Sequence, residues 1–168
     1  MNRDMTSTFA LEGITHRRRA LLVQHGLWII FFGLIGGVGF AFSILGYIEL
    51  WPVLPRVEWL IPGSEKAWLR AHTGPITNGL LALALAGIGG YLRLTEMQQK
   101  VLTACMLFTL WGNTFGYFNA AITGGRGTAF GGSLANSLTY LAFASAVVTV
   151  FVVVVLALVG VRNHRRLG

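Results

Sequence analysis

The sequence predicts an all-α fold, an integral membrane four-helix bundle, from its composition and from the distribution of its apolar residues. Apolar residues make up 54% of the 168 residues and charged residues only 11%, whereas soluble domains carry roughly 25% charged residues. The apolar residues fall into four runs, each long enough to cross the hydrocarbon core as a helix of about 20 residues. Because so few charges could not cover a soluble surface, we expect most of the surface to face lipid.

The four runs cover residues 21–47, 72–92, 101–122 and 138–161, and none carries a formal charge in its middle. We therefore predict a single membrane domain over residues 1–168. The first run could instead be a cleaved export signal, because Arg18 and Arg19 weakly resemble a twin-arginine signal. Its apolar stretch is longer than the roughly 7–15 residues of a signal core, and no small-residue cleavage site follows. We expect it to be retained as the first span.

The basic residues predict the orientation of the chain. The net charge of +7 is clustered at the ends of the apolar runs, which favours a membrane over a nucleic-acid partner. With four spans, both termini and the second loop share one side. The side with the termini holds nine Lys and Arg residues: Arg3, Arg17, Arg18, Arg19, Arg93, Lys100, Arg162, Arg165 and Arg166. The opposite side holds four: Arg56, Lys66, Arg70 and Arg126. Since the cytoplasmic side carries the excess positive charge, we predict cytoplasmic termini in a bacterial inner membrane.

The loops and the remaining motifs favour structural roles. The first outer loop, residues 49–70, combines three of the four prolines with three tryptophans, which is typical of a segment at headgroup depth. The third loop, residues 123–136, is glycine-rich but lacks the Gly-Lys-Ser/Thr ending of a phosphate-binding loop. Gly33 and Gly37 form a GxxxG step that permits close helix packing. The single cysteine, Cys105, leaves no disulfide or metal-binding cysteine pair.

Polar residues inside the second and third runs are the candidates for a functional site, because intramembrane polar groups need partners. His72 and Asn78 lie near the start of the second run, and Asn113 and Tyr117 near the end of the third. The two runs are antiparallel across a short loop, so we expect all four side chains at one depth in the outer leaflet. Asn113 and Tyr117 share a helix face, whereas His72 and Asn78 need not point alike. The alternative is that these groups only hydrogen-bond between helices.

The residue types restrict the chemistry of such a site. No Asp or Glu lies at that depth, which disfavours a hydrolytic triad or a proton relay. A neutral imidazole binds metals, but one histidine does not hold a bare zinc ion well. Haem needs one protein ligand because the macrocycle supplies four nitrogens, so His72 predicts a haem-like cofactor. His25, at the opposite membrane face, is the competing ligand, and His16 and His164 are expected in solvent.

The motifs resemble those of the styrene oxide isomerase family. The match lies in Ile-Pro-Gly-Ser at residues 61–64 with Trp-Leu-Arg-Ala-His-Thr-Gly-Pro at 68–75, in Asn-Gly at 78–79, and in Trp-Gly-Asn-Thr at 111–114 with Tyr117. Gly-Arg-Gly at 125–127 and His-Gly at 25–26 add lesser support. Together these segments cover about half of the chain in patches, in the same order and at similar spacing.

This resemblance implies a four-helix membrane isomerase, a homotrimer with haem b at its subunit interfaces, that converts small apolar aryl epoxides to aldehydes. It implies that His72 is the axial ligand of ferric iron. Asn78 and Tyr117, with Asn113 in a less defined role, would lie around the epoxide. Ferric iron would act as a Lewis acid on the epoxide oxygen, and a 1,2-hydride shift would follow.

Arg70 and Arg126, both on the predicted outer side, are candidates to pair with haem propionates. Two other functions are compatible with the residues alone. One is a membrane haem protein for electron transfer or sensing without catalysis, and the other is a cofactor-free structural or transport subunit.

Overall fold

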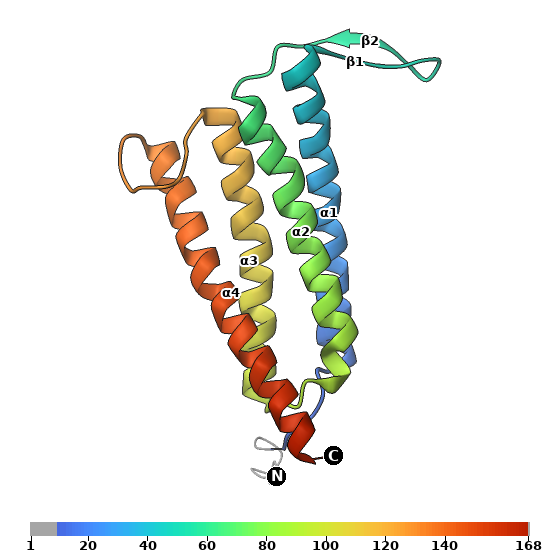
Figure 1. Ribbon diagram of the computed structural model, residues 1–168, viewed down its shortest axis with the longest axis vertical. Helices are drawn as coiled ribbons and strands as arrows, with labels where there is room; N and C mark the ends of the chain where they lie inside the picture. Colours follow the sequence, from blue (N-terminus) through green and yellow to red (C-terminus); the bar gives the residue numbers. More distant parts are fainter. Residues whose placement is uncertain (1–9, 168) are drawn as a thin grey trace, which may run out of the picture.

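The computed structural model describes residues 10–167, so Arg3, one of the charges counted above, lies outside the described residues. The chain forms four long α-helices, as predicted: α1 His16–Leu45, α2 Glu65–Ile88, α3 Glu96–Thr123 and α4 Leu134–Leu167. They lie side by side along the long axis of the molecule, with α1 against α2, α2 against α3 and α3 against α4 (Figure 1).

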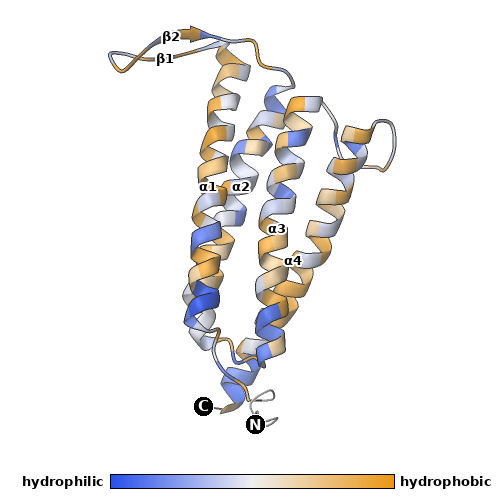
Figure 2. Cartoon of the chain, turned by 180° about the vertical axis from the view of Figure 1, so that it is seen from behind, coloured by the Kyte–Doolittle hydropathy of each residue, from blue (hydrophilic) through white to orange (hydrophobic). Residues whose placement is uncertain are grey.

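Three of the helices, α1, α3 and α4, are long and apolar enough to cross a membrane. Only 11% of the most apolar stretch of α4 is buried inside the chain, so its remaining apolar surface needs another apolar medium. The most hydrophilic residues gather at the end of the molecule where α1 begins and α4 ends (Figure 2). Helix α2 is not among the three, and its role as a span remains a prediction.

Capping residues move the helix ends away from the ends of the apolar runs. Helix α2 begins at Glu65 rather than near residue 72, because the Ser64 side chain accepts a hydrogen bond from Ala67 N at 3.3 Å. It ends at Ile88, and the 3₁₀ turn η2, Gly89–Tyr91, follows. Helix α3 starts inside the predicted second loop, because Thr95 and Gln98 form a reciprocal capping box.

The first outer loop contains a hairpin that the sequence did not predict. Strands β1, Tyr47–Leu50, and β2, Leu54–Glu58, pair antiparallel. The hairpin extends sideways from the end of α1, across the direction of the helices (Figure 1). The connection between its strands is exposed, with Trp51 at 79% and Val53 at 88%. An apolar tip lying across the helix direction fits the predicted position at headgroup depth.

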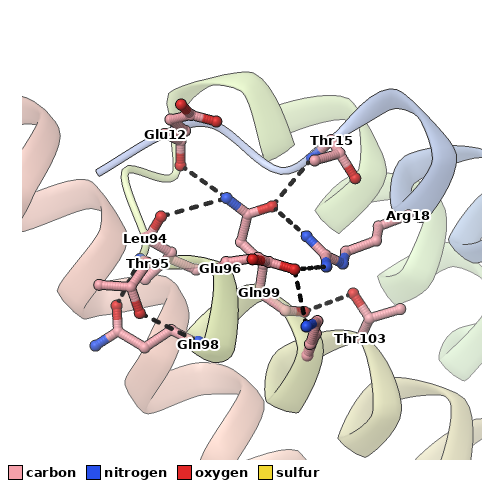
Figure 3. A network of polar contacts seen from close by, with 10 residues as sticks. Glu12, Thr15, Arg18, Leu94, Thr95, Glu96, Gln98, Gln99 and Thr103 are labelled. Atoms are coloured by element: carbon pink, nitrogen blue, oxygen red, sulfur yellow. Dashed lines mark hydrogen bonds and ion pairs between the residues drawn. The ribbon is translucent and has the colours of Figure 1, made fainter. Parts of the chain in front are cut away.

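The segment before α1 docks on the connection between α2 and α3. Glu12 and Leu94 exchange two main-chain hydrogen bonds of 3.1 and 2.9 Å. The buried Gln99 side chain completes this contact (Figure 3): its Oε1 accepts from Thr15 N and Arg18 Nη1, and its Nε2 donates to the carbonyls of Glu12 and Leu94. One amide therefore joins the N-terminal segment, α1 and α3.

Glycines allow α1 and α2 to approach closely. Gly26, Gly33, Gly36 and Gly39 are all buried on the face of α1 that meets α2. A Cβ at Gly36 would overlap the carbonyl oxygen of Ala71, the carbonyl that loses its helical donor because Pro75 has no N–H. This close packing fixes the register of α2 against α1 and so positions His72.

Candidate active site

The imidazole of His72 is held by α1. Its Nδ1 lies 2.9 Å from the main-chain oxygen of Gly33. Because a carbonyl oxygen only accepts hydrogen bonds, the neutral ring carries its proton on Nδ1 and keeps a lone pair on Nε2. The ring lies over Gly37, where a Cβ would be only 2.7 Å from Nδ1. His72 is therefore orientated as a metal-ligating histidine is, with its second nitrogen bonded to the backbone.

His25 is arranged differently. Its Nδ1 accepts a hydrogen bond of 3.1 Å from the indole Nε1 of Trp111, so its proton lies on Nε2 and its lone pair is already used. The neighbouring Gly26 packs on Gly79, which puts His25 roughly 12–15 Å from His72 along the helix axis at 1.5 Å per residue. His25 is thus displaced from His72 toward the end where α1 begins, and its position at the opposite membrane face stays a prediction.

Tyr117 lies between α2 and α4. Its ring lies against Gly74, where a Cβ would overlap the ring carbons. The ring also packs on Phe143, with ring centroids 5.0 Å apart and the planes tilted by 56°. Since Gly74 is two residues from His72, Tyr117 and His72 lie within about 3 Å of one depth along α2.

Asn78 and Asn113 lie about one helical turn farther from the outer end. Asn78 follows Gly74 by four residues and Asn113 precedes Tyr117 by four, so on antiparallel helices both are about 6 Å from the Gly74–Tyr117 contact. The Nδ2 atom of Asn78 is buried and has no hydrogen-bond partner within the described chain. A buried donor without a partner is rare and costly, so this atom needs an acceptor from a bound molecule or a neighbouring chain.

The four predicted residues lie within about 9 Å of one another along the helix axis but do not converge within one chain. His72 contacts α1, whereas Tyr117 contacts Gly74, about 200° farther around α2 at 100° per residue. Asn78 shares the Gly74 face. The surface between these two faces of α2 carries the exposed residues Arg70, Thr73 and Thr77. Any single ligand touching both His72 and Tyr117 would have to cover this surface.

Arg70 and Arg126 both have exposed side chains, in the second turn of α2 and in the loop between α3 and α4. Neither takes part in the ion pairs of residues 10–167, so both guanidinium groups can meet an anion. In the same residues no three His, Cys, Asp or Glu side chains gather as they would around a bare metal ion. The donor set fits a cofactor that brings its own ligands.

Three contributors to the site were missed in the sequence. The carbonyl of Gly33 and the flat surface at Gly74 belong to the backbone, although glycines in otherwise apolar helices were a signal for close approach. Phe143 lies in an apolar helix full of similar residues, and nothing in its spacing singles it out.

The fold and the site define a helical protein of membrane type, in which an imidazole with a free lone pair and a tyrosine lie at similar heights on different faces of α2. The family model described as styrene oxide isomerase matches residues 18–162. A styrene-oxide isomerase of Pseudomonas fluorescens is 31% identical over 116 residues, which cover 69% of this chain and 68% of that protein. This chain therefore belongs to the styrene oxide isomerase family, as the motifs predicted, and it is an isomerase.

Proposed function

We propose that this isomerase converts aryl epoxides such as styrene oxide to aryl acetaldehydes, with ferric haem b as cofactor. The observation that carries the proposal is the hydrogen bond between His72 Nδ1 and Gly33 O, which leaves Nε2 free to bind iron. When bound, ferric haem supplies a Lewis acid for the epoxide oxygen without any net change in redox state. Arg70 and Arg126, both exposed and outside the ion pairs, are candidates to hold its propionates.

The proposed roles of Tyr117 and Asn78 follow from where charge develops. When the benzylic C–O bond of the epoxide opens, negative charge grows on oxygen and positive charge on the benzylic carbon. The hydroxyl of Tyr117 and the unpaired Nδ2 of Asn78 are donors for that oxygen, and Asn113 lies at the depth of Asn78. A hydride then moves from the terminal to the benzylic carbon, the Meinwald rearrangement, and the C=O bond of the aldehyde forms.

The surroundings of Tyr117 favour rearrangement over hydrolysis. Its ring packs with the apolar cluster of Trp68, Ala71 and Ala121 and against Phe143. Water at the benzylic cation would give a diol instead of an aldehyde, so an apolar wall that excludes water protects the product. No general base is needed, because the migrating hydrogen stays on the substrate.

We further propose a homotrimer of membrane four-helix bundles, with both termini cytoplasmic in a bacterial inner membrane and the site shared between subunits. The separation of His72 and Tyr117 around α2 supports this, because a cofactor covering that face would meet a neighbouring chain. The exposed polar residues Arg70, Thr73 and Thr77 lie on the same face. A covering subunit suits the Arg70 guanidinium better than lipid, in which charged groups are costly, whereas the hydroxyls of Thr73 and Thr77 already donate to carbonyls of α2.

The test is the conversion of styrene oxide to phenylacetaldehyde by the detergent-purified protein, with an optical spectrum of the same sample. We expect high-spin ferric haem, loss of haem and activity in His72→Ala, and no loss in His16→Ala, which changes an exposed histidine. Robust turnover by haem-free His72→Ala would refute the proposal. A six-coordinate, low-spin haem without turnover would favour an electron-transfer or sensing protein, and a colourless, inactive protein a structural subunit.

A further inference from the structure

Phe143 of α4 occupies a slot formed by two glycines and a tyrosine. A Cβ at Gly116 of α3 would lie 2.6 Å from Phe143 Cε1, and a Cβ at Gly127 would lie 3.0 Å from its Cδ2. Tyr117 forms the third side, at 5.0 Å between ring centroids. The Phe143 ring therefore fits against α3 because residue 116 has no side chain, and it also lies close to residue 127, where a Cβ would first meet Thr139 Cγ2 at an overlapping distance.

The slot is closed by the loop between α3 and α4, which is itself fixed to α4. Gly127 has a φ of +61°, a conformation that suits glycine, and its N–H donates to Asn136 Oδ1 at 3.0 Å. The Nδ2 of Asn136 donates to the carbonyls of Ala129 and Gly131, each at 2.8 Å. One asparagine side chain thus holds three points of the loop, and Phe143 lies against a well-bonded wall.

Tyr117 is clamped as a result. Its ring packs against both the Gly74 backbone and Phe143, and a ring in a close-packed site cannot turn unless its neighbours move. The direction of the Tyr117 hydroxyl therefore depends on a residue of α4, whereas His72 is held by α1.

We propose that Phe143 is a positioning residue, which fixes the direction of the Tyr117 hydroxyl and thereby the rate of epoxide opening. This inference rests on the proposed function, because it needs Tyr117 to act on the epoxide oxygen. A donor misplaced by a fraction of an ångström loses transition-state stabilisation while ground-state binding is little affected. A substitution of Phe143 should thus lower kcat only when the Tyr117 hydroxyl is present.

A double-mutant cycle tests this coupling. We expect Phe143→Leu to lower kcat about tenfold with unchanged KM and haem spectrum, and to change kcat less than twofold when Tyr117→Phe is already present. Phe151→Leu, on an exposed part of the same helix, should have no effect in either background. Equal losses from Phe143→Leu with and without the Tyr117 hydroxyl would overturn the proposal, as would full activity of Tyr117→Phe.

Fluorine NMR provides a readout that does not depend on turnover. The chain has four tyrosines, so after labelling with 3-fluorotyrosine the Tyr117 signal is the one lost in Tyr117→Phe. In the full-length protein, reduced under carbon monoxide so that bound haem is diamagnetic, we expect a Tyr117 signal from one fixed ring orientation. Phe143→Leu should shift and average it, and Phe151→Leu should not. An unchanged signal in Phe143→Leu would refute the positioning of Tyr117 by Phe143, even if the wild-type enzyme isomerises epoxides. If the signal changes as expected but the wild-type enzyme does not turn over epoxides, the positioning is supported and the proposed function is refuted.

Discussion

The imidazole Nδ1 of His72 lies 2.9 Å from the main-chain oxygen of Gly33, so a histidine on α2 is orientated by the backbone of α1. A backbone acceptor cannot be removed by mutating a side chain. The register of the two helices, which the glycines of α1 determine, therefore controls which nitrogen of His72 is free. The consequences of this relationship can be tested at the neighbouring glycines.

Gly37→Ala should displace the His72 ring. The added Cβ would lie 2.7 Å from Nδ1 and 2.9 Å from Cε1, well inside van der Waals contact, so the imidazole must rotate away from Gly33. We expect haem binding to weaken by tenfold or more, measured by titration of the haem-free protein. The control is Gly87→Ala in α2, where no atom lies within 4 Å of the new Cβ and alanine raises helix propensity by about 0.5–1 kcal/mol. Unchanged haem affinity in Gly37→Ala would contradict the orientation of His72 described above.

Asn78→Leu should separate stability from activity. Its buried Nδ2 has no partner, and an unpaired buried donor costs about 1–3 kcal/mol, so removing it should leave Tm unchanged or raised. If Asn78 donates to the epoxide oxygen, kcat should fall about 100-fold, in line with other oxyanion donors.

The contrasting variant is Asn119→Leu. The Nδ2 of Asn119 donates to the Ala135 carbonyl at 2.8 Å and to the Thr139 hydroxyl at 2.7 Å, so this change should lower Tm, because it removes two hydrogen bonds between α3 and α4. A lower Tm in Asn78→Leu as well, with activity retained, would mean that Asn78 only packs the helices.

The helices and the similar height of His72 and Tyr117 along them could be predicted because both follow from where apolar runs begin and end. Tyr117 lies at the depth of His72 since a short connection makes α2 and α3 antiparallel neighbours. The start of α1 was not predicted in the same way: Arg17, Arg18 and Arg19 are helical in α1, so the helix begins before its apolar run. Hydropathy detects the membrane, while capping and charge determine the helix ends.

The direction of each side chain could not be predicted, because it depends on the contact between helices. His72 points to α1 owing to the glycines at 33 and 37, and their alignment with α2 appears only when the two helices are packed. The clamp on Tyr117 requires Phe143 from α4 and Gly127 from a loop, residues that share no local pattern. Such contacts between distant segments determine the site and leave no periodic signal in the sequence.

Gln99→Leu should release the segment before α1. The Gln99 amide makes four hydrogen bonds (Figure 3), among them those from Thr15 N at 3.2 Å and from Arg18 Nη1 at 2.9 Å. Loss of a buried partner costs about 1–3 kcal/mol, so Tm should fall and the Thr15 amide should exchange faster with deuterium. Gln24→Leu, at an exposed position of α1, is the control. Equal exchange at Thr15 in both variants would show that the main-chain bridge between Glu12 and Leu94 suffices.

Trp51 should report the depth of the hairpin in a membrane. Its side chain is 79% exposed at the tip of the β1–β2 hairpin, which extends across the helix direction from the outer end of α1 (Figure 1). In the proposed orientation the indole lies at the headgroups, where tryptophan is favoured. Trp28, 51% exposed near the middle of α1, should instead face the acyl chains. In nanodiscs, the emission of each tryptophan is obtained as the difference between the wild type and the variant in which it is replaced by Phe. We expect lipids brominated close to the headgroup to quench the Trp51 emission most. Lipids brominated near the chain ends should quench the Trp28 emission most. If neither bromine position quenches Trp51, the hairpin stands in water or is covered by a neighbouring subunit, and crosslinking of the tip to a second chain distinguishes these two positions.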